Sequence, residues 1–144
     1  MKIGIISDHR GYDLKKKILK ELKEYNLKDY GTNSKDMVDY PDYAFKLGEA
    51  INKKEVDLGI AICGSGIGMS IACNKVKNIR CARVTSIKDV IITRKDNDAN
   101  IIAFSSSINF ERVKRMIETF IETPFKEEER YKRRNKKIKE YEQR

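Results

Sequence analysis

Apolar residues follow two different spacings along the chain. Short, nearly continuous apolar runs predict buried strands at residues 3–6, 26–30, 58–62, 80–84 and 100–104. Between them, apolar residues recur every three or four positions and predict amphipathic helices at residues 14–25, 40–52, 69–75, 87–95 and 113–121. Strands that alternate with helices favour an α/β fold, a Rossmann-like three-layer sandwich around a five-stranded parallel sheet.

The composition changes after Pro124. Residues 126–144 contain nine Lys or Arg and five Glu, a net charge of +4 out of +9 for the whole chain. Tyr131, Ile138 and Tyr141 form a thin apolar stripe that predicts a charged helix. We expect one domain, with a Rossmann-like body over residues 1–125 and a C-terminal helical arm over residues 126–144. The arm is either a solvated terminal helix or a segment that packs on a second subunit and delivers arginines to its site.

The composition argues against several classes of protein. The longest apolar runs span only a few residues, so we expect no membrane partner. The N-terminus turns polar after residue 6 and lacks the apolar stretch of a signal peptide, which favours a cytoplasmic protein. The positive charge is interleaved with acids and shows no aromatic-studded basic stripe, so nucleic acid is not an expected partner. Three cysteines and one histidine lack the spacing of a disulfide framework or a zinc site.

The segment ICGSGIGMSIACNK, residues 62–75, is the strongest candidate for chemistry. Gly64, Gly66 and Gly68 stand at alternate positions between an apolar strand and a helix. This spacing fits neither the dinucleotide-binding fingerprint nor the P-loop. Two interpretations stay open: the glycines allow close packing of helix and sheet, or they expose N–H groups that attract an anion.

Cys63 and the only histidine are the other candidates. Cys63 ends a predicted buried strand beside the glycine turn, where helix dipole and backbone donors are expected to favour its thiolate. Cys73 and Cys81 fit the commoner pattern of inert buried cysteines. Asp8 and His9 end the first strand, so we expect them in the same crevice as Cys63. One histidine is a weak basis for a Cys–His hydrolase, and proton abstraction by Cys63 fits these residues better.

Several segments together carry a resemblance to a known family. They are SDHRGY near the N-terminus, the GTNS turn, VDYPDYA, ICGSGIGMSIACNK, IRCARV, NDANIIAF and the arginine-rich tail. With these segments the chain resembles type B ribose-5-phosphate isomerases and the related galactose-6-phosphate isomerase subunits, across nearly its whole length. The resemblance implies an aldose–ketose isomerase of the pentose phosphate pathway that acts on a phosphorylated sugar and needs neither metal nor other cofactor.

The resemblance also implies roles for individual residues. By motif position, Cys63 is the base that moves a proton between C1 and C2, and the hydroxyl of Ser65 relays a proton between O1 and O2. The turn from Gly64 through Gly66 to Gly68 is the anion hole for the enediolate. The implied substrate contacts are Asp8, His9, Tyr43, Asn97 and two phosphate-binding arginines, Arg130 and Arg134. In this family the site is shared between two subunits, which implies a homodimer or a tetramer.

Three positions depart from the family pattern. Asp96 stands where the family has a histidine that opens the sugar ring, so ring opening falls to Asp96 with a raised pKa, to His9, or to the spontaneously open fraction of the substrate. Ser107 stands where an arginine is common. The tail pattern G-G-R-H reads Glu128-Glu129-Arg130-Tyr131 after an apparent one-residue insertion, which predicts an altered grip on the phosphate.

Three functions therefore stay open. The first is a homo-oligomeric ribose-5-phosphate isomerase. The second is an isomerase of galactose 6-phosphate or another six-carbon sugar phosphate, including one subunit of a two-protein enzyme whose related partner completes the site. The third is a sugar-phosphate-binding protein without catalysis, against which the retained Cys63 and Ser65 argue.

Overall fold

The computed structural model describes residues 1–143 and contains a parallel five-stranded sheet in the order β2-β1-β3-β5-β4. The strands are β1 (Lys2–Ser7), β2 (Asn26–Asp29), β3 (Leu58–Cys63), β4 (Cys81–Arg83) and β5 (Ile101–Ser105). The helices are α1 (Tyr12–Glu21), α2 (Tyr40–Asn52), α3 (Ile67–Cys73), α4 (Ile87–Asn97), α5 (Phe110–Glu122) and α6 (Glu129–Glu142). All neighbouring strands pair in parallel, and the predicted α/β fold is confirmed.

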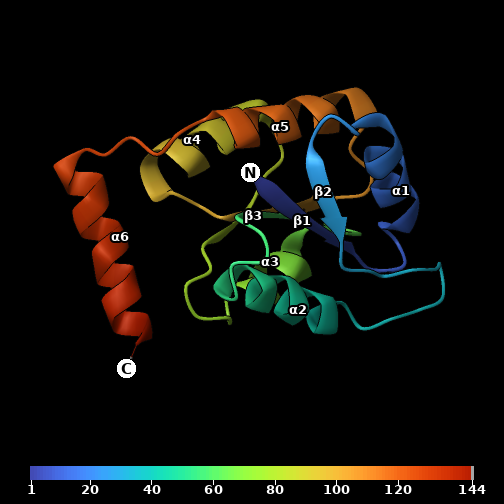
Figure 1. The fold of residues 1–144 in the computed structure, drawn as a ribbon, viewed down its shortest axis with the longest axis horizontal. Coiled ribbons are helices and arrows are strands. Elements are labelled where there is room, and N and C mark those ends of the chain that lie inside the picture. The colour runs from blue at the N-terminus through green and yellow to red at the C-terminus, as the bar shows by residue number, and fades with distance from the viewer. Residues whose placement is uncertain (144) are drawn as a thin grey trace.

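Helices cover both faces of the sheet (Figure 1). On one face, α2 and α3 bury Leu47 and Met69 in a core cluster with the sheet residues that point that way. On the other face, α1, α4 and α5 contribute Ile18, Val90 and Phe120 to a second cluster. The central strand β3 is buried along its whole length because helices pack on both of its sides.

Helix α6 lies beside this sandwich, apart from both helix layers (Figure 1). The N–H of Lys126 donates to the carbonyl of Lys95 at 3.0 Å, which fixes the segment before α6 to α4. Near the other end of α6, the N–H of Asn78 donates to Oε2 of Glu142 at 2.7 Å. Ile138 on this helix stays 50% exposed. None of the helices within residues 1–143 is both long and apolar enough to cross a bilayer.

The predicted end of the first helix is wrong. The apolar stripe predicts a helix through Tyr25, but α1 ends at Glu21. Leu22 leaves the helical conformation with φ −112° and ψ 44°, and the N–H of Tyr25 donates to the carbonyl of Leu22 at 3.2 Å in a turn. Tyr25 still packs against the core cluster under α1. Its apolar ring therefore reflects core packing in a turn and not a helical face.

Helix α3 begins and ends two residues earlier than predicted, and Asn74 explains where it ends. The Nδ2 of Asn74 donates to the carbonyls of Ser70 at 3.0 Å and Cys81 at 2.8 Å. Its Oδ1 accepts from the N–H of Cys81 at 2.8 Å. These bonds join the end of α3 to β4. The glycine turn is therefore held between β3, which precedes it, and α3, which is fixed to β4.

Candidate active site

The strands β1 and β3 lie side by side in the sheet, and the strands that follow each of them extend the sheet on opposite sides of this pair. Strand β2 lies beyond β1, whereas β5 and β4 lie beyond β3. The loops that follow β1 and β3 separate at this point and leave a crevice, the usual ligand position in an open parallel sheet. A hollow of about 240 Å³ lies there, and its lining residues are Asp8, His9, Arg10, Tyr40, Cys63, Gly64, Ser65 and Gly68.

Asp8 and His9 follow β1 as predicted. Asp8 is buried, and its Oδ1 accepts from the N–H groups of Arg10 at 2.9 Å and Gly11 at 3.0 Å. This carboxylate shapes the turn into α1. Nδ1 of His9 accepts from the N–H of Val38 at 3.3 Å. The neutral imidazole of His9 therefore carries its proton on Nε2, where it is a hydrogen-bond donor.

Cys63 is the last residue of β3 and is only 5% exposed. Its Sγ accepts a hydrogen bond from the N–H of Gly66 at 3.1 Å. Gly66 has φ +79°, and a Cβ at this position would lie 2.8 Å from the Cα of Phe104. Only glycine fits this backbone conformation in the space available. The turn therefore brings a backbone donor directly to the sulfur.

The rest of the turn is held through its carbonyl groups. Nε of Arg83 donates to the carbonyl of Ser65 at 3.0 Å, and the hydroxyl of Ser105 donates to the carbonyl of Gly64 at 2.6 Å. The Oγ of Ser65 accepts from the N–H of Ile67 at 3.1 Å. The N–H groups of Gly64 and Ser65 make no hydrogen bond with the residues that the structure describes. Backbone donors beside the thiol are thus available to an anionic oxygen.

The other two cysteines lie outside the hollow. Cys73 and Cys81 are buried free thiols. The pKa of Cys81 is raised well above its ordinary value, first by a hydrogen bond with Cys73 and then by burial. Cys81 is therefore a protonated thiol at neutral pH, which agrees with its predicted inert role.

Sequence reasoning missed two residues of the hollow, Arg10 and Tyr40. A Cβ on Gly64 would lie 2.8 Å from Cδ of Arg10, so the arginine side chain lies directly over this glycine. A Cβ on Gly68 would lie 2.6 Å from Cζ of Tyr40, so the tyrosine ring rests on the start of α3. Arg10 lies in SDHRGY and Tyr40 lies in VDYPDYA, two segments that carry the family resemblance. Their position inside these segments was the one sequence feature that could have indicated a place at the site.

The remaining predicted residues do not line this hollow. The ring of Tyr43 lies against Gly31, where a Cβ would meet it at 2.6 Å. Asn97 lines a separate hollow of about 370 Å³ between β4, α4 and α6. Arg130 and Arg134 are exposed on α6. Within one protomer, Asn97 and the tail arginines thus lie outside the hollow at Cys63 and form a second group of predicted residues.

Asp96 belongs to this second group. The pKa of Arg130 is raised, first by a hydrogen bond with the hydroxyl of Tyr131 and further by the charges of Glu128 and Asp96. Asp96 is half-buried in the last turn of α4. The carboxylate at the position of the expected histidine therefore lies within electrostatic reach of a predicted phosphate arginine.

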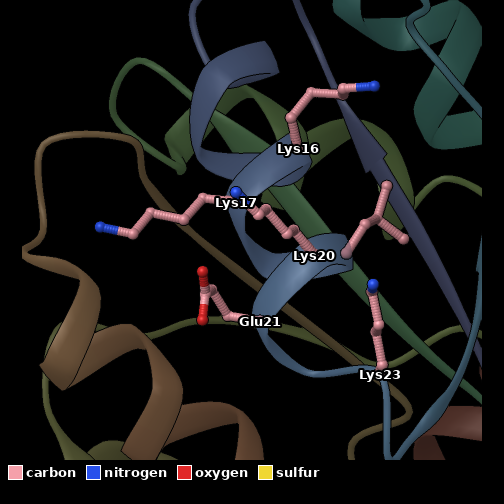
Figure 2. A pocket seen from close by; sticks show the side chains of 6 residues that line it. Lys16, Lys17, Lys20, Glu21 and Lys23 are labelled. Carbon is pink, nitrogen blue, oxygen red and sulfur yellow. The ribbon is translucent and has the colours of Figure 1, made fainter.

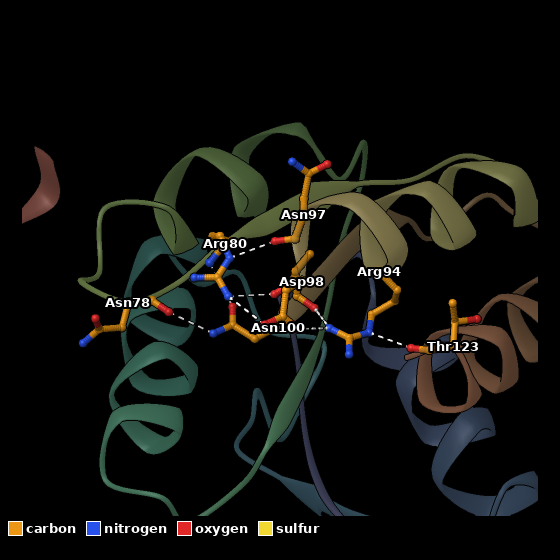
Figure 3. Close-up of polar contacts among 8 residues, drawn as sticks. Asn78, Arg80, Arg94, Asn97, Asp98, Asn100 and Thr123 are labelled. Atoms are coloured by element: carbon orange, nitrogen blue, oxygen red, sulfur yellow. Dashed lines mark hydrogen bonds and ion pairs between the residues drawn. The ribbon is translucent and has the colours of Figure 1, made fainter. Parts of the chain in front are cut away.

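Two arginines anchor the segment that follows Asp96 (Figure 3). Arg80 donates from Nε to the carbonyl of Asn97 at 2.9 Å and from Nη2 to the carbonyl of Asp98 at 2.8 Å. Arg94 donates from Nη1 to Oδ1 of Asp98 at 2.9 Å and from Nε to the carbonyl of Thr123 at 3.1 Å. Asp98 has φ 46°, and these contacts hold it in that left-handed conformation.

Lys15 is a buried cation below the site. Its Nζ lies 2.6 Å from Oδ1 of Asp29 and 2.6 Å from the carbonyl of Thr32. The N–H of Thr32 donates in turn to the carbonyl of Ser7 at 2.9 Å. Lys15 therefore holds the GTNS turn against the end of β1, directly before Asp8.

Replacing Lys15 with methionine is expected to lower the free energy of unfolding by roughly 1.5–3 kcal/mol, because a carboxylate and a buried carbonyl lose their charged donor. Urea denaturation measures the effect. Lys16→Met is the matched control, since Lys16 is an exposed neighbour on the same helix, and we expect it to change the free energy by less than about 0.5 kcal/mol. Equal unfolding midpoints for the two variants would show that the Lys15 contacts add nothing to stability.

A larger hollow of about 590 Å³ lies on the outer side of α1 (Figure 2). Its lining residues are Lys16, Lys17, Leu19, Lys20, Glu21 and Lys23. Figure 2 shows the side chains of Lys16 and Lys17 pointing away from each other. The lining holds a single acid and no thiol or imidazole, so the smaller hollow at Cys63 is the better candidate for chemistry.

Comparison with known proteins identifies the family of this chain. A family model described as Ribose/Galactose Isomerase matches residues 3–138. The structure of ribose-5-phosphate isomerase B from Clostridium thermocellum is 42% identical, with a TM-score of 0.95 over 99% of this chain and 98% of that chain. A Mycoplasma genitalium ribose-5-phosphate isomerase B with bound ribulose-5-phosphate is 37% identical, with a TM-score of 0.91 over 99% of this chain and 96% of that chain.

Curated sequences give the same result. The protein named ribose-5-P isomerase B from Listeria innocua is 38% identical over 110 residues, which cover 75% of this chain and 74% of the relative. The chain therefore belongs to the ribose/galactose isomerase family of sugar-phosphate isomerases.

Proposed function

We propose that this chain interconverts ribose 5-phosphate and ribulose 5-phosphate with Cys63 as the base. The observation that carries the proposal is the arrangement at the end of β3, where the buried thiol accepts from the N–H of Gly66 and adjoins the available N–H groups of Gly64 and Ser65. A base and an anion hole are the two parts that an enediolate mechanism needs.

The proposed reaction moves one proton along the substrate. The thiolate of Cys63 removes the proton from C2 of the open-chain aldose, and the resulting charge spreads over O1 and O2 as an enediolate. The backbone N–H groups stabilise this charge as it develops, while the hydroxyl of Ser65 passes a proton between the two oxygens. Return of the abstracted proton to C1 gives the ketose, so the redox change is internal and needs no external electron carrier.

We further propose that the second group of residues completes the site of a partner protomer. Asp96, Asn97, Arg130 and Arg134 lie away from the hollow of their own chain. The hollow of about 240 Å³ is also small compared with typical ligand pockets, which span about 300–1,000 Å³. Exposed apolar side chains on α2 and α3 supply surface for such an assembly, and they include Phe45 at 43%, Ile67 at 49% and Ile71 at 58%.

One assay tests the proposal. The purified chain is given a panel of five- and six-carbon aldose phosphates, and its native mass is measured. We expect turnover of ribose 5-phosphate by a homodimer or tetramer. Turnover of galactose 6-phosphate alone, or activity that appears only with a related second chain, would favour the six-carbon or heteromeric alternative that the aspartate at position 96 suggests. Substrate binding without exchange of the C1 or C2 proton in deuterated water would support the third alternative, a sugar-phosphate-binding protein without catalysis.

Asp96→His is expected to raise kcat/KM on cyclic ribose 5-phosphate by about tenfold or more. An imidazole titrates near neutral pH, whereas an ordinary carboxylic acid is ionised there and has no proton to give to the ring oxygen. Asp96→Asn is the control, because it removes the charge without adding an imidazole. An unchanged rate in Asp96→His, measured by stopped-flow with equilibrated anomers, would assign ring opening to another group.

A further inference from the structure

Arg10 is a cation at the active-site hollow, and among residues 1–143 it has no acidic partner. Its backbone follows His9, and its side chain lies over Gly64. No ion pair among residues 1–143 includes its guanidinium. The one acid that lines the hollow, Asp8, uses its Oδ1 to accept from the backbone N–H groups of Arg10 and Gly11. The guanidinium therefore keeps its donors for a ligand.

Arg10 and Cys63 occupy different depths of the hollow. Cys63 is 5% exposed at the end of β3, whereas Arg10 is an exposed residue. The reacting carbons of a sugar phosphate must reach the thiol, so the phosphate at the other end of the molecule stays nearer the surface. A guanidinium binds phosphate oxygens through two parallel N–H donors, and this geometry suits Arg10 to that end of the substrate.

Two of the three cations that the family pattern assigns to the phosphate are engaged or absent in this chain. Nη2 of Arg130 lies 3.0 Å from Oε2 of Glu128 and donates to the hydroxyl of Tyr131 at 2.9 Å. Ser107 stands in place of an arginine, and its hydroxyl lies 2.7 Å from that of Ser105. The third, Arg134, is exposed on α6 and does not line the hollow of its own chain, whereas Arg10 does.

We propose that Arg10 binds the phosphate group of the substrate in the hollow of its own protomer. This inference rests on the proposed sugar-phosphate isomerase function and adds a residue that determines its substrate affinity. We expect Arg10 to contribute ground-state binding and not proton transfer, because it is an exposed residue over Gly64 while Gly66 supplies the donor at the sulfur.

The test compares wild type with Arg10→Gln, Arg10→Lys and the control Arg112→Gln. Arg112 is an exposed arginine on α5, outside the hollow. Binding of inorganic phosphate is measured by calorimetry, and KM and kcat are measured with ribose 5-phosphate. For Arg10→Gln we expect the Kd of phosphate and the KM to rise about 10- to 100-fold, with kcat within about threefold of wild type. Arg10→Lys should recover part of the affinity, and Arg112→Gln should match wild type.

Three results would overturn the inference. The first is a Kd for inorganic phosphate in Arg10→Gln within about twofold of wild type. The second is a fall in kcat with phosphate binding unchanged, which would place Arg10 at the reacting end of the substrate. Wild-type chain that binds phosphate through Arg10 but turns over no sugar phosphate would refute the proposed isomerase and leave the phosphate contact standing. The third result that would overturn the inference is wild-type chain that binds no inorganic phosphate at millimolar concentration, which would refute the contact itself.

Discussion

Cys63→Ala is expected to lower kcat for ribose 5-phosphate by about 10³-fold or more, while the Kd of the substrate changes by less than about threefold. In the proposed reaction the thiol takes the proton, and loss of a catalytic base affects the transition state far more than the bound ground state. Steady-state kinetics give kcat, and calorimetry with the inactive variant gives the Kd.

Cys73→Ala is the matched control for this prediction. Cys73 is also a buried free thiol, but it lies outside the hollow, so its loss should cost stability and leave kcat close to wild type. Retention of more than a tenth of the wild-type kcat in Cys63→Ala would assign the base to another residue. Deuterium incorporation at C2 in that variant would give the same answer without a coupled assay.

Gly66→Ala is expected to lower the free energy of unfolding by roughly 2–5 kcal/mol. Part of this cost is the left-handed backbone at φ +79°, worth about 1–2 kcal/mol for a residue with a Cβ, and the rest is overpacking. The added Cβ would lie 2.8 and 2.9 Å from backbone atoms of Phe104, and the backbone of a central strand cannot shift to relieve these contacts. Activity should fall as well, because the turn that presents its N–H to Cys63 is distorted.

Gly64→Ala separates this effect from the mere addition of a methyl group. The Cβ at Gly64 would meet only the flexible end of Arg10, and the backbone there is not left-handed. We expect a loss of less than about 1 kcal/mol, together with weaker phosphate binding as Arg10 is displaced. Similar urea midpoints for the two variants would contradict the strained conformation assigned to Gly66.

The fold could be predicted from the sequence because buried positions are apolar, and their spacing differs between strands and helices. Each central strand is a short apolar run, and Tyr40–Asn52 was predicted at its observed bounds because Pro41 suits a first helical turn and an apolar stripe follows. Tyr25 misled the prediction, since an aromatic ring that packs from a turn has the same spacing as one on a helix. Periodicity reports burial, and it does not distinguish these two ways of reaching the core.

The candidate site was predicted as far as topology alone determines it. Asp8, His9 and Cys63 were placed together because parallel strands end at the same edge of the sheet. Arg10 was missed because its side chain lies over Gly64, a residue far away in the sequence, where a Cβ would occupy the same space. Lys15 was missed because a lysine on an amphipathic helix normally faces solvent, and only the end of β2 with Asp29 and the following turn with the buried Thr32 give it partners.

The contacts that Arg80 and Arg94 make around Asp98 have a consequence for how position 96 changes over evolution. The main chain there is held by side chains that belong to other positions, so the identity of residue 96 is separable from the folding of its segment. A substitution at Asp96 exchanges one functional group for another at a fixed place and leaves the scaffold unaltered. Mutation of this one codon would therefore change the functional group at the proposed ring-opening position while the contacts that hold its segment remain.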